Sequence, residues 1–169
     1  MKNRQSNRLY NWDYRDVSDY FITICVKNFN LKFGSIIDGK MIYSPVGVIA
    51  EICWKQIPIF NKHIALGEYV IMPNHMHGVI EINEKIISTR DVKGYHSEIS
   101  PNQGSISTIV RTYKSMVTKH ARRLGFEFDW HNRYYDHIIK NGREYQRIED
   151  YILNNIEKWD EDRFYSSGS

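Results

Sequence analysis

Two strand-like runs separated only by Pro73-Asn74 constrain the fold of this 169-residue chain more than any other feature. The runs are Ile64 to Met72 (IALGEYVIM) and His75 to Ile82 (HMHGVIEI), and both are rich in β-branched or aromatic residues. Because Pro and Asn favour tight turns, we expect the two runs to pair as antiparallel neighbours. The two histidines then stand at the beginning of a strand.

Strand and helix signals on either side of this pair extend the pattern. Aromatic and β-branched segments indicate strands, and apolar residues at helical spacing after a capping serine indicate helices. Asp38-Gly39 favours the tight turn of a small hairpin. The expected strands cover residues 19–28, 31–35, 40–43, 64–72, 75–82 and 134–140, and the expected helices cover residues 44–58, 105–125 and 143–158.

The order of these elements is strand, helix, strand, strand, helix, strand, followed by a C-terminal helix. This order predicts an α+β fold, a ferredoxin-like split βαβ sandwich with an antiparallel sheet and helices on one face. The open face of the sheet is then available for a functional site. We expect a single domain over residues 1–165. Residues 84–103 are polar and aperiodic and are expected to form a mobile loop, and residues 166–169 a flexible tail.

Composition places the chain among globular proteins of a reducing compartment. No apolar run approaches the roughly 20 residues that cross a bilayer, and the N-terminus lacks the apolar region of a secretory signal. Cys25 and Cys53 each lie in an apolar segment, which favours reduced core thiols over a disulfide. We therefore expect a cytoplasmic protein without a membrane partner.

The positive charge of the chain is concentrated in its second half. A net charge of +3 permits a polyanionic partner but does not require one. Between residues 105 and 147 the basic residues outnumber the acidic ones. A surface that faces nucleic-acid phosphates and a solvated helix face explain this equally well. The candidate DNA-binding residues are Arg111, Lys114, Arg122, Arg123, Arg133 and Lys140.

The spacing of His75 and His77 suits metal binding. Residues i and i+2 of a strand project from the same face, so the two imidazoles can converge on one ion while Met76 points into the opposite layer. A His-x-His pair alone is weak evidence, and ordinary surface histidines are the alternative.

The context of the pair carries a resemblance to a known family. The segment YVIMPNHMHGVIEI resembles the His-hydrophobic-His signature of the HUH single-tyrosine transposases, and in particular that of the REP-associated tyrosine transposases. Residues 8–28 (RLYNWDYRDVSDYFITICVKN) and 130–155 (WHNRYYDHIIKNGREYQRIEDYILNN) look like the opening region and the closing strand and helix of that family. Three matches in the same order extend the resemblance over most of the chain.

The resemblance implies a set of site residues. Tyr151 takes the place of the nucleophile, and Asn155 takes the place of a third metal ligand beside His75 and His77. At helical spacing Tyr151 and Asn155 share one face of the last helix. Tyr145 is expected to face elsewhere on that helix.

Two positions depart from the family pattern. Ile156 follows Asn155 where many relatives have proline, so the last helix is expected to continue further here than in those relatives. His131 stands where a glutamine commonly follows the tryptophan.

The function implied by the resemblance is transposition. Such an enzyme would cleave and rejoin single-stranded DNA near hairpins through a 5′-phosphotyrosine, with Mg²⁺ or Mn²⁺ as the divalent metal. The partner would be single-stranded or hairpin DNA, and both monomers and homodimers are consistent with the resemblance. Two alternatives stay open: a catalytically inactive regulator that binds DNA hairpins, and a metal-dependent phosphodiesterase that activates water.

Overall fold

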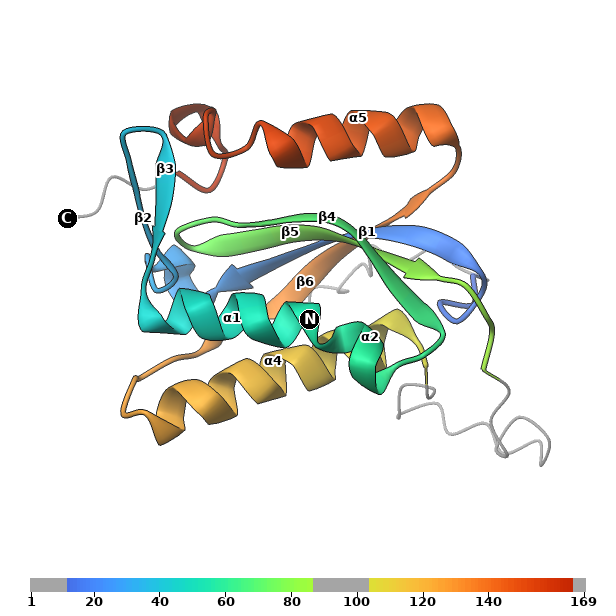
Figure 1. Ribbon diagram of the computed structural model, residues 1–169, viewed down its shortest axis with the longest axis horizontal. Helices are drawn as coiled ribbons and strands as arrows, with labels where there is room; N and C mark the ends of the chain where they lie inside the picture. The colour runs from blue at the N-terminus through green and yellow to red at the C-terminus, as the bar shows by residue number, and fades with distance from the viewer. Residues whose placement is uncertain (1–11, 87–103, 166–169) are drawn as a thin grey trace, which may run out of the picture.

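A four-stranded antiparallel sheet with the order β4-β5-β1-β6 forms the centre of the protein (Figure 1). The computed structural model describes residues 12–86 and 104–165. Most of the expected loop and the whole expected tail therefore lie outside the described residues. The strands are β1 (Ser18–Val26), β4 (Ile64–Ile71), β5 (His75–Ile82) and β6 (Trp130–Ile139).

Helices cover both faces of this sheet. In Figure 1, α1 and α4 lie against one face and α5 crosses the other. The split βαβ order is confirmed. The expectation of helices on one face holds for α1 and α4, whereas α5 lies on the other face. The helices are α1 (Pro45–Lys55), α2 (Ile57–Phe60), α4 (Ile106–Arg123) and α5 (Gly142–Leu153), with short 3₁₀ turns η1 (Lys27–Phe29) and η2 (Trp159–Glu161) and a hairpin of β2 (Gly34–Ile37) and β3 (Lys40–Tyr43).

The two faces of the sheet differ because side chains alternate along each strand. On β5, Met76 and Ile80 are fully buried in the large apolar core with Trp54 of α1 and Tyr113 of α4. The intervening residues of β5 point to the other face, beneath α5. The apolar face thus anchors the fold and leaves the second face available for polar side chains.

A smaller apolar cluster holds α5 on that second face. Ile148 and Ile152 of α5 pack with Val79 of β5, and Trp159 of η2 is buried in the same cluster. Burial of each such side chain contributes about 1.5–3 kcal/mol. The cluster therefore fixes the position of α5 and of the chain that follows it.

Several element boundaries differ from the sequence expectation. The last helix ends at Leu153 rather than at residue 158, because the side chain of Asn154 donates to the carbonyl of Asp150 at 2.6 Å and the chain then turns to bury Trp159. Asn155 consequently lies beyond the helix. The first helix divides at Gln56 into α1 and α2, and β6 begins at Trp130 because its pairing with β1 continues past a bulge.

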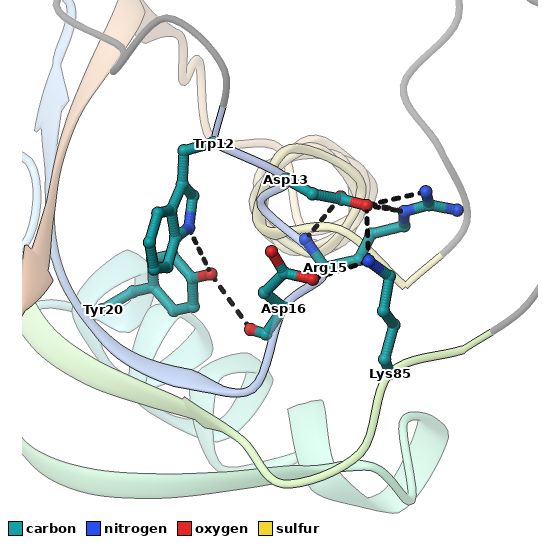
Figure 2. Close-up of polar contacts among 6 residues, drawn as sticks. All are labelled: Trp12, Asp13, Arg15, Asp16, Tyr20 and Lys85. Carbon is teal, nitrogen blue, oxygen red and sulfur yellow. Dashed lines mark hydrogen bonds and ion pairs between the residues drawn. The ribbon is translucent and has the colours of Figure 1, made fainter.

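A polar network joins the segment before β1 to the segment after β5 (Figure 2). Lys85 forms ion pairs with Asp13 at 2.9 Å and Asp16 at 2.6 Å. The Arg15 side chain donates to Asp13, and this contact holds the pKa of Asp13 well below its usual range. Nearby, Tyr20 donates to the carbonyl of Asp16 at 3.1 Å. The network closes the end of the sheet that lies away from the histidines.

Both cysteines are free and buried, as expected. Across residues 12–86 and 104–165, no helix combines the length and the apolar character that crossing a membrane requires.

Helix α1 packs closely against the backbone of Phe33 at Gly47, and this close approach yields a stability prediction. A Cβ at this position would lie 2.0 Å from the carbonyl oxygen of Phe33. Gly47→Ala should therefore lower the free energy of unfolding by about 1–3 kcal/mol, as overpacking does. Gly142→Ala is the control, because a Cβ there meets nothing within 4 Å, and it should be neutral or raise stability by up to about 1 kcal/mol. Urea unfolding measures both variants, and equal stability would contradict the prediction.

Candidate metal and nucleophile site

His75 and His77 lie side by side on β5 and face α5, as strand alternation predicts. Their side chains are almost fully buried, and their Nε2 atoms are 3.1 Å apart. The strand β5 is an inner strand of the sheet, flanked by β1 and β4. Both rings are therefore held on a rigid part of the fold and point to one place.

The Nδ1 atoms of the two rings are occupied by buried partners. Asn74 Oδ1 lies 2.8 Å from Nδ1 of His75, and Thr23 Oγ1 lies 2.8 Å from Nδ1 of His77. The amide of Asn74 donates to the carbonyls of Phe29 and Phe164, which fixes its oxygen towards His75. His75 therefore carries its proton on Nδ1. If Thr23 accepts a hydrogen bond from Nδ1 of His77, the Nε2 atoms of both rings carry lone pairs that point towards each other. A cation bound between the two nitrogens would relieve their repulsion.

Burial keeps both imidazoles neutral. It lowers the pKa of His77 to about 3, and the positive charge of Arg163 acts in the same direction. Burial is also the main cause that lowers the pKa of His75 well below its usual range, and the neighbouring His77 and the positive charge of Arg163 act in the same direction. Neutral imidazole is the form that binds metal ions.

Asp162 joins the two histidines, and the sequence interpretation missed it. Its Oδ2 lies 3.8 Å from Nε2 of His75, and one ligand atom from each of His75, His77 and Asp162 falls within 4.8 Å of the others. No sequence spacing links Asp162 to the two histidines. It follows η2 in the chain, and the burial of Trp159 brings this segment to β5.

Asn155, the expected third ligand, also lies in the interior. Its side chain is buried, and within the described part of the chain its Oδ1 has no hydrogen-bond partner. A buried amide oxygen without a partner is a suitable ligand atom. Two imidazole nitrogens with an amide or carboxylate oxygen form a donor set that fits a first-row divalent ion.

The hydroxyl of Tyr151 reaches the same place from α5. It lies 3.1 Å from Nε2 of His77, and the side chain remains 45% exposed to solvent. Burial raises the pKa of Tyr151, the charge of Asp162 raises it further, and a hydrogen bond with Asn155 lowers it. The protein alone therefore does not ionise this tyrosine. The exposed fraction leaves its oxygen accessible to a substrate.

Tyr145 does not face away from the site, contrary to the expectation. Its hydroxyl donates to Oε1 of Glu81 at 2.6 Å, on the same face of β5 as the histidines. A Cβ on Gly67 of β4 would lie 2.4 Å from that hydroxyl. Tyr145 and Tyr151 thus connect α5 to β5 at two points, so Tyr145 contributes to the position of the helix.

The candidate DNA-binding residues do not gather into one cluster. Lys114 and Arg122 of α4 line one open hollow of about 360 Å³. Lys114 donates to the carbonyl of His131 at 2.7 Å, and Arg122 pairs with Asp129 at 2.7 Å. Lys140 lies beyond the opposite end of β6. The remaining three, all exposed, are Arg111, Arg123 and Arg133.

Comparisons with known proteins agree on the fold. An uncharacterized protein of Haemophilus influenzae is 40% identical over 167 residues, which cover 96% of this chain and 93% of that protein. The structure of a REP-associated tyrosine transposase bound to a REP hairpin superposes with a TM-score of 0.60 at 17% identity, over 89% of this chain and 73% of the other. At this identity the similarity establishes a shared fold. No family model matches the sequence.

We predict that the protein binds one divalent ion at the two histidines. His75→Ala and His77→Ala should each abolish the binding of Mn²⁺ or Co²⁺ measured by calorimetry, because each removes one of two converging nitrogens. His120→Ala, a change of an exposed histidine on α4, is the control and should bind as the wild type does. Unchanged metal affinity in both His75→Ala and His77→Ala would reject the proposed metal site.

The third ligand can be assigned by a second pair of variants. Asp162→Asn removes a charge and should weaken binding about 10- to 100-fold, whereas Asn155→Ala removes a neutral oxygen and should weaken it less. The Co²⁺ absorption spectrum reports the change of ligand in each case. A larger loss with Asn155→Ala would make the amide the third ligand.

Proposed function

Because this chain belongs to the same family as the Haemophilus influenzae protein and shares its fold with a REP-associated tyrosine transposase, we propose that it is a metal-dependent single-tyrosine DNA-strand transferase. The observation that carries the proposal is the contact of the Tyr151 hydroxyl with Nε2 of the buried His77, which itself lies 3.1 Å from Nε2 of His75. Neither the fold nor the histidine pair alone would distinguish this chemistry from other uses of the fold.

In this proposal His75 and His77 hold the divalent ion, with Asp162 or Asn155 as the third ligand. A divalent ion held there, Mg²⁺ or Mn²⁺, would supply Lewis-acid polarisation of a scissile phosphodiester. The nitrogen donors favour Mn²⁺ over Mg²⁺. Nε2 of His77 has one lone pair and cannot serve both the ion and the Tyr151 proton. If His77 held the ion, the Tyr151 hydroxyl would give up its contact with Nε2 of His77 and would be free to approach a substrate.

Tyr151 acts as the nucleophile. Its oxygen forms a bond to phosphorus, the bond from phosphorus to the 3′ oxygen breaks, and the phenolic proton finally resides on that 3′ oxygen. The carboxylate of Asp162, whose negative charge helps to raise the pKa of Tyr151, is an anionic group that can accept the proton on the way. The resulting 5′-phosphotyrosine keeps the energy of the ester, so a 3′ hydroxyl can reverse the reaction and rejoin DNA.

The substrate we propose is single-stranded or hairpin DNA. An open pocket of about 440 Å³ adjoins Tyr151 and carries the basic side chains Arg147, Lys158 and Arg163. Basic side chains neutralise phosphates irrespective of sequence. Acidic residues share this pocket, so the basic groups act at particular positions rather than as a uniform positive surface.

Replacement of Tyr151 tests the proposal. Tyr151→Phe keeps the ring and its edge contact with Phe21 while it deletes the nucleophilic oxygen. The variant should fold and bind metal, yet form no covalent adduct with a labelled single-stranded hairpin oligonucleotide in denaturing electrophoresis. Tyr69→Phe is the control, since its hydroxyl bonds to Glu51 on the opposite side of the sheet, and it should form the adduct at the wild-type rate.

The same gel separates the two alternatives. Cleavage without an adduct, equal in wild type and Tyr151→Phe, would identify a water-activating phosphodiesterase. Absence of both adduct and cleavage on this gel, together with metal-independent binding of the hairpin in a native mobility-shift assay, would identify an inactive regulator.

A further inference from the structure

A series of contacting aromatic rings leads from the histidines to the beginning of β6. Phe164 packs on His75 with ring centroids 4.7 Å apart. Phe29 stacks on Phe164 at 5.5 Å, with 19° between the ring planes, and His131 stacks on Phe29 at 6.0 Å and 28°. These rings come from the C-terminal segment, η1 and β6. Phe29 and His131, at the outer end of this series, are both exposed to solvent.

The backbone at η1 is strained in a way that keeps Phe29 at the surface. Asn28 and Phe29 have φ angles of 57° and 55°. Asparagine adopts this left-handed region readily, but it costs a phenylalanine about 1–3 kcal/mol. Two contacts hold this conformation: Asn74 donates to the carbonyl of Phe29 at 3.1 Å, and the Lys27 amide donates to the carbonyl of Asp129 at 3.0 Å. Phe29 remains 38% exposed as a result. Simple core filling would not require such a backbone.

Cations lie at both ends of this series of rings. The guanidinium of Arg163 lies 4.4 Å from the centre of the Phe164 ring. At the other end, Lys114 donates to the carbonyl of His131 and lines the open hollow beside β6. The other residues of this hollow are Ser115, Thr118, Lys119, Arg122 and Trp130. Aromatic faces flanked by cations suit a polyanion with unpaired bases.

We propose that Phe29 and His131 form a stacking surface for unpaired bases of the DNA strand that enters the Tyr151 site, and that Lys114, Lys119 and Arg122 bind the phosphates beyond them. This rests on the proposed strand-transferase function. Every base has a π face, so the surface tolerates any sequence but requires a strand whose bases are free. It therefore distinguishes single-stranded from duplex DNA.

Binding of a fluorescent, hairpin-free oligothymidylate tests the surface. Fluorescence anisotropy is measured in EDTA, so that no cleavage occurs and the result does not depend on tyrosine chemistry. Phe29→Leu and His131→Ala should each weaken binding about 5- to 100-fold, whereas Phe29→Tyr should stay within twofold of the wild type. Neither loss should appear with a duplex of the same length. Phe60→Leu, a change of a 66% exposed phenylalanine at the other end of the sheet, is the matched control and should have no effect.

Each outcome decides between the two proposals. Unchanged single-strand affinity in both Phe29→Leu and His131→Ala overturns the stacking surface, even if the wild type forms the tyrosine adduct. If thermal unfolding shows that Phe29→Leu is destabilised, His131→Ala decides alone, because it keeps the carbonyl that Lys114 binds. Selective loss of single-strand binding in a protein that forms no adduct supports the surface and rejects strand transfer.

Discussion

Asn74 holds together the parts of the protein on which the proposed chemistry depends. Its side chain is fully buried and uses its oxygen for His75 and its nitrogen for the carbonyls of Phe29 and Phe164. One amide therefore sets the ring orientation of a metal-ligand candidate, the position of an exposed aromatic ring and the path of the segment that carries Asp162. Loss of such a side chain would leave buried polar groups without partners, which costs about 1–3 kcal/mol for each group.

The sheet separates structural from chemical tasks between its two faces. The face beneath α1 and α4 is apolar and contains the main core, so it can support the fold without polar groups. The face beneath α5 carries His75, His77 and Glu81, and α5 binds there through the small cluster and the Tyr145–Glu81 hydrogen bond. The helix thereby brings Tyr151 to the histidines as a rigid unit, and a rigid unit positions a side chain more accurately than a loop does.

The electrostatics of the site explain why a cation belongs in the proposed mechanism. Burial favours neutral forms of both His77 and Tyr151, since it lowers the pKa of the imidazole and raises that of the phenol. A neutral phenol is a weak nucleophile, so reactivity must come from a charge that the substrate complex supplies. The carboxylate of Asp162 lies beside the histidines, where it would balance such a charge.

The family resemblance, rather than any local rule, singled out Tyr151, and its role stays a prediction. The sequence alone determined the element order, the antiparallel pairing of β4 with β5, and the common face of His75 and His77. These follow from local rules, because strand alternation and turn chemistry act over a few residues. Only the tertiary structure decided that α5 ends at Leu153, that Tyr145 binds Glu81, and that Asp162 and Phe164 reach β5. Those contacts depend on the burial of Trp159 and on hydrogen bonds between residues up to 90 positions apart, and no local pattern encodes such long-range packing.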